Sequence, residues 1–438
     1  MQRAHLLVVF DRGSAAPLEI TAGLESLGDV TFAVADSTYT RPLLPLLRES
    51  ARIVVLSESY QRNLADLRKL RFSAIVTFSE RLLRLTARLA HDLGLPYHSS
   101  EVASLLTDKH LQRNQLRESG VENTLSHLIK SSDEWHRAVR ALGFPLVLKP
   151  QRGEGSRDTY LVTDPEQGSA VVARMLSAAG ATGTGEKQLV AEEFLRGRPE
   201  RIWGDYVSVE SAVQGTSIHH VAVTGKFPLR HPFREVGQFW PAALSEDEDR
   251  QVKELTERAL RALGVSIGMT HTEIKLTPRG PRIIEVNGRL GGHISDLARR
   301  ANGLDLIELA GRLALGEPVD PDTRMKTSRV IFQYSNLAPT TAFRLETVIG
   351  SSQVRSHTAV SQYTPYILPG EHVEAGVGTR WLDILHGEVN THADLIATID
   401  EANRDLFFEF RFEDSDRPER VSAASLSKIA GDEAGLLI

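Results

Sequence analysis

The chain has 438 residues, more than one hydrophobic core usually serves, and about 150 residues per domain predicts roughly three structural units. Its 51 Lys and Arg residues against 57 Asp and Glu give a formal net charge of -6 at pH 7. This balance gives no general attraction to nucleic acid or to an anionic membrane surface, so neither is expected as a partner. Hydrophobic residues make up 41% of the chain, enough for packed cores.

Cysteine does not occur in the sequence. Disulfides, thiolate metal sites and a cysteine nucleophile are therefore excluded, and a reducing cytoplasm fits this composition. The N-terminal segment MQRAHLLVVFDRG holds a short apolar run before Asp11. That run predicts a buried strand and neither a signal peptide nor a membrane span. We expect a soluble cytoplasmic protein.

The beginning of the chain alternates apolar runs (HLLVVF, VTFAVA, RIVVLS, SAIVTFS) with helix-like stretches at 43–48 and 80–93. This alternation predicts a parallel α/β domain over residues 1–105. The segment LGLPYHSS, which ends this part, resembles the start of a further strand. The next segment, SSEVASLLTDKHLQRNQLRESGV, predicts helices with Ser and Asp caps that end at Gly120.

Residues 106–200 predict a small α+β lobe. After the helix DEWHRAVRALG come the strand FPLVLKPQ, the glycine-rich turn RGEGSRD, the strand TYLVTD, a helix, a mobile ATGTGEKQ segment and the strand LVAEEFL. Residues 201–318 add the strands DYVSVESAVQ, SIHHVAVTG, THTEIKLTP and PRIIEVNG with the helix DEDRQVKELTERALRALG. They predict a second lobe, rich in antiparallel strands.

After Pro318 the pattern changes. The strands RVIFQYSN and YTPYILPG, several glycine turns and the helix HADLIATIDEANRDL predict a C-terminal α+β domain over residues 319–438. The last segment, SDRPERVSAASLSKIAGDEAGLLI, is weakly periodic, and we expect a loosely held end.

The segment THTEIKLTPRGPRIIEVNGRLGG predicts a hairpin with a cation site. Glu273 lies on the first strand, and Glu285 and Asn287 share one face of the second because strand side chains alternate with period two. Magnesium prefers such oxygen donors together with water and substrate phosphates, so a nucleotide is expected nearby. The alternative is that these carboxylates are solvated on a surface hairpin.

Arg289 and the double glycine Gly291-Gly292 follow this hairpin. A planar guanidinium suits phosphate or carboxylate recognition, although a salt bridge would explain Arg289 more simply. The double glycine suggests that a ligand approaches the backbone closely.

Lys149 lies on an apolar strand, where a buried ammonium needs an anionic partner. A phosphate or an internal carboxylate would each provide one. In the following turn, Gly153, Gly155 and Ser156 can expose backbone N–H groups to phosphate oxygens, although an ordinary hairpin turn has similar residues.

The strand LVAEEFLRG suits an adenine ring. Its backbone and the Glu192 carboxylate can hydrogen-bond an adenine edge, and Phe194 or Leu195 can cover the ring. Generic strand sequence is the alternative.

In this order, the TFSE and LGLP segments, TDKHLQRNQLRESGV, the Lys-Pro strand and EVNGRLGG resemble the ATP-grasp superfamily from residue 75 to residue 315. Within it, the chain looks most like the carboxylate-amine ligases that include the bacterial L-amino-acid ligases, or dipeptide synthetases. The resemblance implies a three-part ATP-grasp fold, with an N-terminal parallel α/β domain and a two-lobed core, to which this chain adds a C-terminal α+β domain. It also implies ATP and Mg²⁺ or Mn²⁺ as cofactors.

The resemblance implies roles for individual residues. ATP phosphates would be held by Lys109 and Lys149, and covered by a loop containing Gly153, Gly155 and Ser156. Adenine would be held by Glu192, Glu193, Phe194 and Leu195. Ribose would be held by Asp205, with Glu200 as a competitor. Magnesium would be held by Glu273, Glu285 and Asn287. Arg289 would stabilise the acyl phosphate.

Substrate residues follow from the same resemblance. In FREVGQFWPA, Glu235 would contact the amino group of the first substrate. Gln238 stands where some of these ligases have histidine; an amide can donate to an oxyanion but cannot titrate near neutrality, which puts a general-base role there in doubt. Gly291, Gly292 and His293 would border the acyl pocket, and ordinary packing is an equal explanation for a lone histidine.

The implied reaction joins a small carboxylic acid, such as an amino acid, to an amine through an acyl phosphate, with Arg289, Glu235, Gln238 and Lys149 as catalytic candidates and ADP and phosphate as products. A homodimer is the base-rate expectation for its assembly. Two rivals remain: an ATP-grasp ligase of purine, cofactor or carrier-protein acylation chemistry, and a catalytically silent nucleotide-binding module. A dinucleotide-binding dehydrogenase is disfavoured, because DRGSAAP and not GxGxxG follows the first strand.

Overall fold

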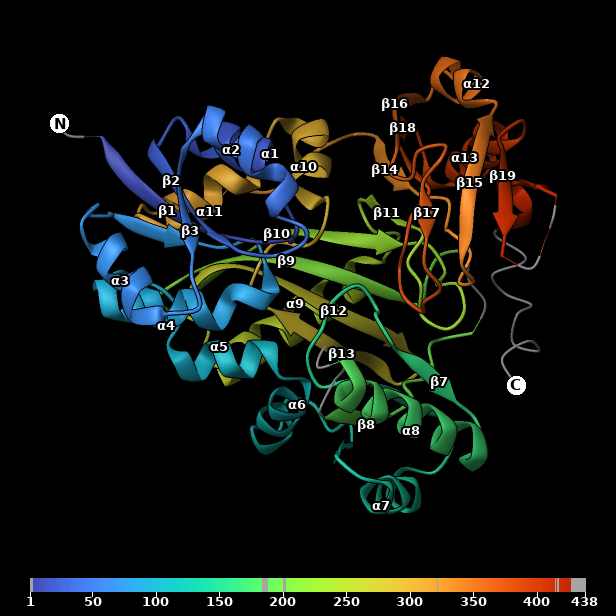
Figure 1. The fold of residues 1–438 in the computed structure, drawn as a ribbon, viewed down its shortest axis with the longest axis horizontal. Coiled ribbons are helices and arrows are strands. Elements are labelled where there is room, and N and C mark those ends of the chain that lie inside the picture. The colour runs from blue at the N-terminus through green and yellow to red at the C-terminus, as the bar shows by residue number, and fades with distance from the viewer. Residues whose placement is uncertain are drawn as a thin grey trace.

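The computed structural model describes residues 3–182, 188–199, 202–320, 322–413, 415 and 417–426. Figure 1 shows the order of its parts, with the N-terminal sheet at the left, the small lobe at the bottom and the C-terminal region at the right. The expected mobile segment ATGTGEKQ falls largely outside the described residues, as does Glu200. The expectation of a loose end is wrong for its first part, because Glu419–Ser422 pair with Phe407–Phe410 as a strand, and residues 427–438 lie outside the described residues.

The N-terminal part is a parallel α/β unit, as predicted. Its sheet has the order β3-β2-β1-β4, with parallel pairing throughout. The strands are β1 (Ala4–Phe10), β2 (Gly28–Ala35), β3 (Arg52–Leu56) and β4 (Ala74–Val76). The helices are α1 (Pro17–Leu24), η1 (Arg41–Leu43), α2 (Leu44–Ser50), α3 (Tyr60–Arg68), η2 (Glu80–Leu82) and α4 (Leu83–Leu93).

Alternation along β1 divides the N-terminal core into two layers. Leu6 and Val8 pack with α1 and with a helix that follows much later, α11 (Leu306–Ala314). Leu7 and Val9 point to the opposite face and pack with α3 and α4. Both faces are therefore covered, which explains why this strand reads as a continuous apolar run.

Two capped helices lead from this unit into the small lobe, as expected. Ser99 caps α5 (Ser100–Thr107) by accepting from the Val102 N–H at 3.2 Å, and Asp108 caps α6 (Lys109–Glu118) by accepting from the Leu111 N–H at 3.1 Å. The expected strand at LGLPYHSS is wrong: residues 95–99 are irregular, because the chain turns at Gly94 and Ser99 already begins the next helix.

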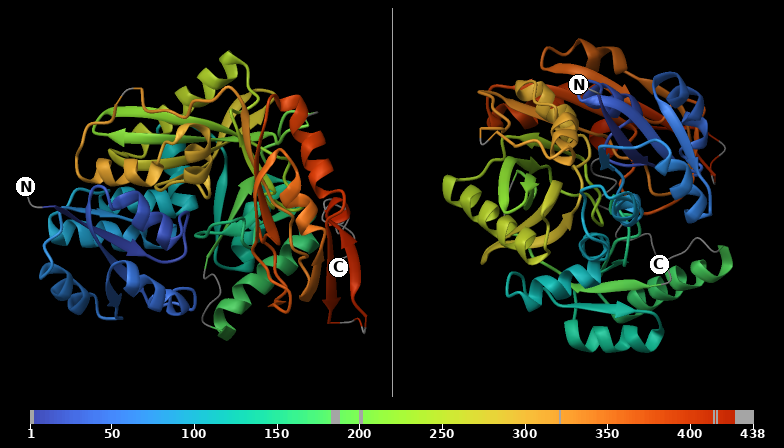
Figure 2. Two further views of the ribbon diagram at one scale, coloured as in Figure 1. Left: turned by 90° about the horizontal axis from the view of Figure 1, so that it is seen from above. Right: turned by 90° about the vertical axis from the view of Figure 1, so that its left-hand side faces the viewer.

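The small lobe is an antiparallel sheet with the order β5-β8-β6-β7. Its elements are β5 (Ser126–Ile129), α7 (Ser132–Leu142), β6 (Leu146–Pro150), β7 (Tyr160–Val162), α8 (Pro165–Thr182) and β8 (Leu189–Glu193). Trp135 of α7 fills its core and is 1% exposed. In the right-hand view of Figure 2 this lobe lies below the N-terminal sheet and the C-terminal region.

A large antiparallel sheet forms the centre of the molecule, with the order β13-β12-β9-β10-β11-β14-β18-β16. Its strands before Pro318 are β9 (Tyr206–Gln214), β10 (Ser217–Lys226), β11 (Gly237–Trp240), β12 (Ile267–Thr277) and β13 (Gly280–Asn287). Helix α9 (Glu246–Ala262) packs on one face of this sheet, whereas α10 (Ile294–Asn302) and α11 join it to the N-terminal core.

The C-terminal region extends this sheet and adds another. β14 (Val330–Tyr334), β16 (Val360–Pro365) and β18 (Asp383–Val389) continue the large sheet, so hydrogen bonding crosses residue 318. A second sheet has the order β17-β15-β19-β20. The remaining elements are β15 (Phe343–Ile349), α12 (Ser351–Ser356), β17 (His372–Val373), α13 (His392–Asn403), β19 (Phe407–Phe412) and β20 (Glu419–Ser422). The domain divisions at 105, 200 and 318 stay predictions.

Helix length and hydropathy bear on membrane insertion. In the part of the chain that the structure describes, no helix combines the length and the apolar character that crossing a membrane requires.

Candidate active site

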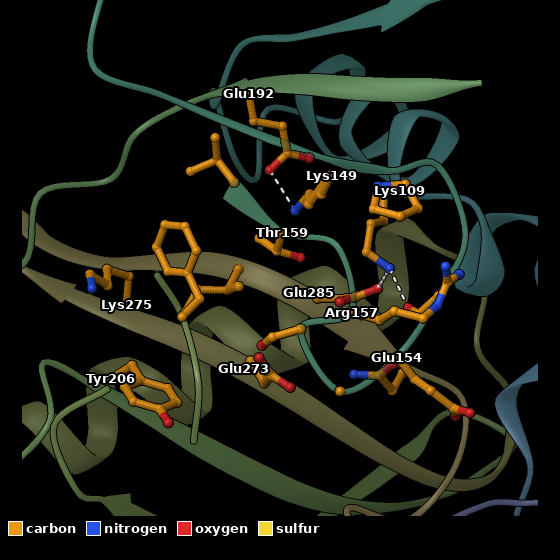
Figure 3. A pocket seen from close by; sticks show the side chains of 18 of the residues that line it. Lys109, Lys149, Glu154, Arg157, Thr159, Glu192, Tyr206, Glu273, Lys275 and Glu285 are labelled. Atoms are coloured by element: carbon orange, nitrogen blue, oxygen red, sulfur yellow. Dashed lines mark hydrogen bonds and ion pairs between the residues drawn. The ribbon is translucent and has the colours of Figure 1, made fainter. Parts of the chain in front are cut away.

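The β12–β13 hairpin places two acidic side chains opposite each other. Glu273 and Glu285 are cross-strand partners, and His271 pairs with Asn287 at the next position on this face. Like charges directly opposite each other destabilise a sheet unless a cation compensates them. Glu273, Glu285 and Asn287 line one cavity, where Figure 3 shows both carboxylates. Their donor atoms fit Mg²⁺ or Mn²⁺.

The hairpin supplies only part of a coordination shell. Among the described residues, no three or more His, Asp or Glu side chains are grouped so that they could hold a metal ion. Magnesium is usually bound through one or two carboxylates plus substrate phosphates and water, so a cation here would share its ligands with a nucleotide.

Two lysines reach the same cavity from the small-lobe side. Lys109 begins α6, and its Nζ lies 2.9 Å from Glu285 Oε1 and donates to the Gly153 carbonyl at 2.7 Å. Lys149 is on β6, and its Nζ lies 2.8 Å from Glu192 Oε2. Figure 3 shows the Lys109–Glu285 and Lys149–Glu192 ion pairs as dashed lines. Burial lowers the pKa of Lys149, whereas for Lys109 the effect of burial is outweighed by Glu285, so its pKa is raised.

Glu192 lies in an ion-pair network, which differs from the expected role of its side chain. The Arg113 guanidinium of α6 donates to both carboxylate oxygens, at 3.2 and 3.1 Å, and Lys149 contacts the second oxygen. Although burial opposes ionisation, these cations lower the pKa of Glu192 to about 2. The carboxylate is therefore occupied, and adenine recognition by this strand would depend on its backbone and on Glu193, Phe194 and Leu195, which also line the cavity.

Arg113 is a residue that the sequence analysis missed. Besides Glu192, it donates to the carbonyl oxygens of Ile283 and Ile284 on β13, at 2.5 and 2.6 Å. It therefore ties the small lobe to the carboxylate hairpin. Its position on a strongly polar helix, KHLQRNQLRE, gave no signal that it would be buried.

The glycine-rich turn has the backbone that a phosphate-binding loop needs. Gly153, Gly155 and Ser156 have φ values of +148°, +66° and +54°, and all three line the cavity. Successive residues in such conformations can turn their N–H groups toward an anion. Glu154 fixes one side of the turn through Arg81, at 3.2 Å.

Arg289 lies at the end of the hairpin, paired with a carboxylate from the N-terminal unit. Its Nη2 is 2.9 Å from Glu80 Oε2, and Nη1 donates to the Leu290 carbonyl at 2.8 Å. Burial raises the pKa of Glu80 to about 7. The salt bridge weighed in the sequence analysis therefore exists, and its carboxylate comes from the TFSE segment. Both side chains also line the cavity.

Asp205 lies beside the cavity rather than in its lining. Its Oδ1 accepts from Lys275 Nζ at 2.6 Å, and Lys275 does line the cavity. Strand alternation places Lys275 on the same face of β12 as Glu273, a signal that was available in the sequence. The assignment of Asp205 to ribose stays a prediction, and its competitor Glu200 lies outside the described residues.

Glu235 belongs to the cavity, as expected, and burial raises the pKa of its carboxyl group. The C-terminal region holds its backbone: Thr379 Oγ1 accepts from the Glu235 N–H at 3.1 Å, and the Trp381 indole donates to the Glu235 carbonyl at 2.8 Å. Nearby, the buried hydroxyl of Tyr206 also lines the cavity and has no hydrogen-bond partner among the described residues. A ligand could satisfy it.

Gln238 is not brought to the lining of this cavity. Its Oε1 accepts from Lys226 Nζ at 2.8 Å, and its Nε2 donates to the Gly292 carbonyl and to Gln333 Oε1, both at 2.9 Å. The side chain is 7% exposed. Its amide therefore belongs to a buried polar network, because all of its neighbours are supplied by the protein.

The two residues of the double glycine differ in their surroundings. A Cβ at Gly291 would lie 2.4 Å from His271 Nδ1, and the Gly291 N–H donates to Glu210 Oε2 at 3.2 Å. Close packing on a buried histidine thus explains Gly291. A Cβ at Gly292 would meet no described atom within 4 Å.

Three further side chains lie near the hairpin and the double glycine: His271, Glu210 and His293. His271 hydrogen-bonds Glu210 through Nδ1, and its Nε2 lies 3.5 Å from Glu273 Oε1. Burial opposes protonation, yet Glu210 raises the pKa of His271 to about 9. His293 packs against the Trp381 ring, with centroids 5.2 Å apart, and is not part of the cavity lining.

The cavity is open to solvent on one side, and its space amounts to about 1060 Å³ when that open part is included. Lysines and backbone amides lie toward the small lobe and acidic groups lie on the hairpin, an arrangement suited to a phosphate chain with a divalent cation.

A family model described as an ATP-grasp domain matches residues 142–296. Among curated proteins, the alanine–anticapsin ligase of Bacillus subtilis (strain 168) is 24% identical over 350 residues, which cover 70% of this chain and 74% of that protein. Carnosine synthase 1 of Homo sapiens is 28% identical over 279 residues, which cover 59% of this chain and 33% of that protein.

Solved structures resemble almost the whole chain. The L-amino acid ligase from Bacillus licheniformis has a TM-score of 0.74 at 19% identity, covering 93% of this chain and 98% of that one. The N5-carboxyaminoimidazole ribonucleotide synthetase from Thermotoga maritima has a TM-score of 0.66 at 16% identity, covering 92% and 99%. These likenesses show the fold, including the arrangement of both lobes and the C-terminal region.

Proposed function

We propose that this chain, in which residues 142–296 match an ATP-grasp domain model, joins a carboxylic acid to an amine while converting ATP to ADP and phosphate. The acid is an amino acid or an amino-acid-like acid, and the product is an amide or a peptide. The observation that carries the proposal is the convergence of Glu273, Glu285 and Asn287 with Lys109 and Lys149 on one cavity.

ATP binding is the first step. The β8 strand and Phe194 would receive the adenine, and Lys109, Lys149 and the backbone of the 153–156 loop would receive the phosphates. Glu273, Glu285 and Asn287 would hold Mg²⁺ or Mn²⁺, which supplies neutralisation of phosphate charge. Binding would also give Lys109 a phosphate partner beside Glu285.

Phosphoryl transfer would follow. A carboxylate oxygen of the acid attacks the γ-phosphorus of ATP, the new C–O–P linkage forms, and the bond to the β-phosphate oxygen breaks so that ADP leaves. The lysines offset the developing charge, and the loop excludes water. Arg289 can exchange its contact with Glu80 for the acyl phosphate, since a guanidinium binds either oxyanion well.

Amide formation completes the reaction. The free amine attacks the acyl carbon, the C–N bond forms, and phosphate leaves with the former C–O bond electrons and takes up the proton that the amine releases. Arg289 stabilises the tetrahedral oxyanion. Glu235 favours an amino acid as the first substrate, because a half-buried carboxylate that lines the cavity can hold its ammonium group.

The test is incubation of the full chain with ATP, magnesium and pairs drawn from a panel of amino acids, with EDTA as the control. We expect phosphate release in proportion to an amide product identified by mass spectrometry. Formation of AMP and pyrophosphate would exclude the acyl-phosphate route. Absence of ADP release with every pair would favour the catalytically silent module.

A second candidate uses the same first step with another acceptor. Fold likeness to N5-carboxyaminoimidazole ribonucleotide synthetase favours a purine, cofactor or carrier-protein ligase as the alternative. Phosphate release that depends on a nucleotide or a carrier protein, and not on amino acids, would select it. A cytoplasmic location and a homodimer stay predictions. Size-exclusion chromatography with light scattering would test the homodimer.

A further inference from the structure

A segment of the C-terminal region, residues 374–381, lies directly against the glycine-rich loop. The Thr379 N–H donates to the Gly155 carbonyl at 3.0 Å, and the Asp158 N–H donates to the Val377 carbonyl at 3.0 Å. Two backbone hydrogen bonds therefore join segments from distant parts of the sequence. They hold the loop at Gly155 and Asp158, whereas Lys109 binds it at the Gly153 carbonyl.

Gly378 is the residue that permits this approach. A Cβ at this position would lie 3.3 Å from Arg157 Cα and 3.7 Å from Arg157 N. These neighbours are backbone atoms, so they would have to move by a few tenths of an ångström to admit a side chain. The φ of +156° at Gly378 adds backbone strain for any residue other than glycine.

The same segment also holds the substrate residue Glu235. Thr379 Oγ1 accepts from the Glu235 N–H at 3.1 Å, and Trp381 Nε1 donates to the Glu235 carbonyl at 2.8 Å. The segment is itself anchored, because the Ala338 N–H donates to the Arg380 carbonyl at 2.9 Å. Thr379 thus contacts the loop through its backbone N–H and the Glu235 backbone through its hydroxyl.

We propose that Gly378 and Thr379 are positioning residues that couple closure of the 153–159 loop to the placement of Glu235. The proposal rests on the proposed function, in which the loop covers ATP phosphates and Glu235 holds the acid's amino group. When the loop opens, its two backbone bonds to the segment must break, and the segment is then less constrained at Glu235. Binding of ATP and of the acid would therefore support each other.

Hydrogen exchange of the full-length protein tests the loop contact without any turnover. We compare Gly378→Val with Ala375→Val, which places the same valine side chain at an exposed position of the same segment. In Gly378→Val we expect the amides of residues 153–159 to exchange about tenfold faster than in the wild type, and in Ala375→Val no change. Equal exchange in the two variants would overturn the proposal.

Thr379 gives a second test that keeps the backbone bonds. Thr379→Val removes the hydroxyl acceptor, and Thr379→Ser restores it. We expect Thr379→Val to raise the KM for the acid about tenfold, with kcat within threefold, and Thr379→Ser to recover the wild-type value. Unchanged KM in Thr379→Val, or no recovery in Thr379→Ser, would contradict the coupling. If Gly378→Val does not fold, the two Thr379 variants still test the proposed coupling.

The two proposals can fail separately. If no acid and amine pair yields an amide, the proposed function fails, while a difference in exchange between the two valine variants still supports the loop contact. In that case calorimetric titration with an amino acid replaces KM for the Thr379 variants. If the wild type is an active ligase and the two valine variants exchange alike, the coupling fails and the function stands.

Discussion

The two sides of the cavity are built in different ways. The hairpin side comes from one continuous segment, in which Glu273 and Glu285 are cross-strand partners. The side that holds Glu235, the proposed substrate side, is assembled from distant segments, since Glu235 precedes β11 and its backbone is held by Thr379 and Trp381 of the C-terminal region. A local periodic pattern therefore suffices to locate the hairpin groups, whereas the substrate groups depend on how the C-terminal region packs.

Removing a carboxylate from the hairpin side is expected to have the largest effect. In Glu285→Ala one of two paired carboxylates is lost, so a divalent cation would be held poorly. We expect kcat/KM to fall about 1,000-fold, equivalent to about 4 kcal/mol, with folding retained. Steady-state ADP release and circular dichroism check both parts.

The matched control for this variant is Arg279→Ala, an exposed residue in the turn of the same hairpin. It should retain wild-type activity. Normal activity in a folded Glu285→Ala variant would show that Glu285 is not part of the proposed metal site. It would also weaken the contrast between the hairpin side and the Glu235 side of the cavity.

The next effect concerns stability, at the point where the small lobe meets the hairpin. Glu192→Gln leaves Arg113 and Lys149 buried without their anion, so the free energy of unfolding at pH 7 should fall by about 3 kcal/mol. Glu193→Gln, its half-buried neighbour, should change it by less than about 1 kcal/mol. Urea unfolding followed by fluorescence measures both.

The pH dependence of the same variant gives an independent check. The folded pKa of Glu192, about 2, lies below the ordinary value of 4.5. Its contribution is therefore fully present above pH 4.5 and is lost as pH falls toward 2. Wild-type stability should decline more steeply than that of Glu192→Gln between these values, and parallel declines would be the contrary result.

On the substrate side, Glu235→Gln keeps the shape but removes the negative charge. We expect the KM for the acid to rise about 30-fold, or about 2 kcal/mol, because an ammonium group would lose its charged partner. The KM for ATP should change less than threefold. Glu374→Gln, an exposed carboxylate of the C-terminal region, is the control. A larger change in the KM for ATP would place Glu235 with the nucleotide instead.

The smallest effect on activity is expected at Gln238, which is not part of the cavity lining. Gln238→Leu deprives Lys226 and the Gly292 carbonyl of their partner, so the free energy of unfolding should fall by about 1–3 kcal/mol. Activity of the folded variant should stay within threefold of the wild type. A 100-fold loss of kcat with unchanged stability would instead restore the oxyanion role considered from the sequence.

Particular residues show which contacts can be predicted from the sequence and which cannot. Ser99 and Asp108 were recognised as helix caps because a cap depends on neighbours within a few residues. Arg113 was missed because its burial depends on carbonyl groups of β13 and on Glu192, both distant in sequence. Glu80 lies in the TFSE segment, but its contact with Arg289 joins the N-terminal unit to the end of the hairpin and leaves no local sequence pattern.

Strand and helix periods act over a few residues, so the sequence alone predicts the strands of the N-terminal sheet and the hairpin that presents Glu273, Glu285 and Asn287. The tertiary structure decided which charged groups are paired: Glu192 with Arg113 and Lys149, and Arg289 with Glu80. It also decided that Gly291 packs on His271. Buried polar groups take partners from whatever segment packs beside them, and that packing is a property of the whole fold.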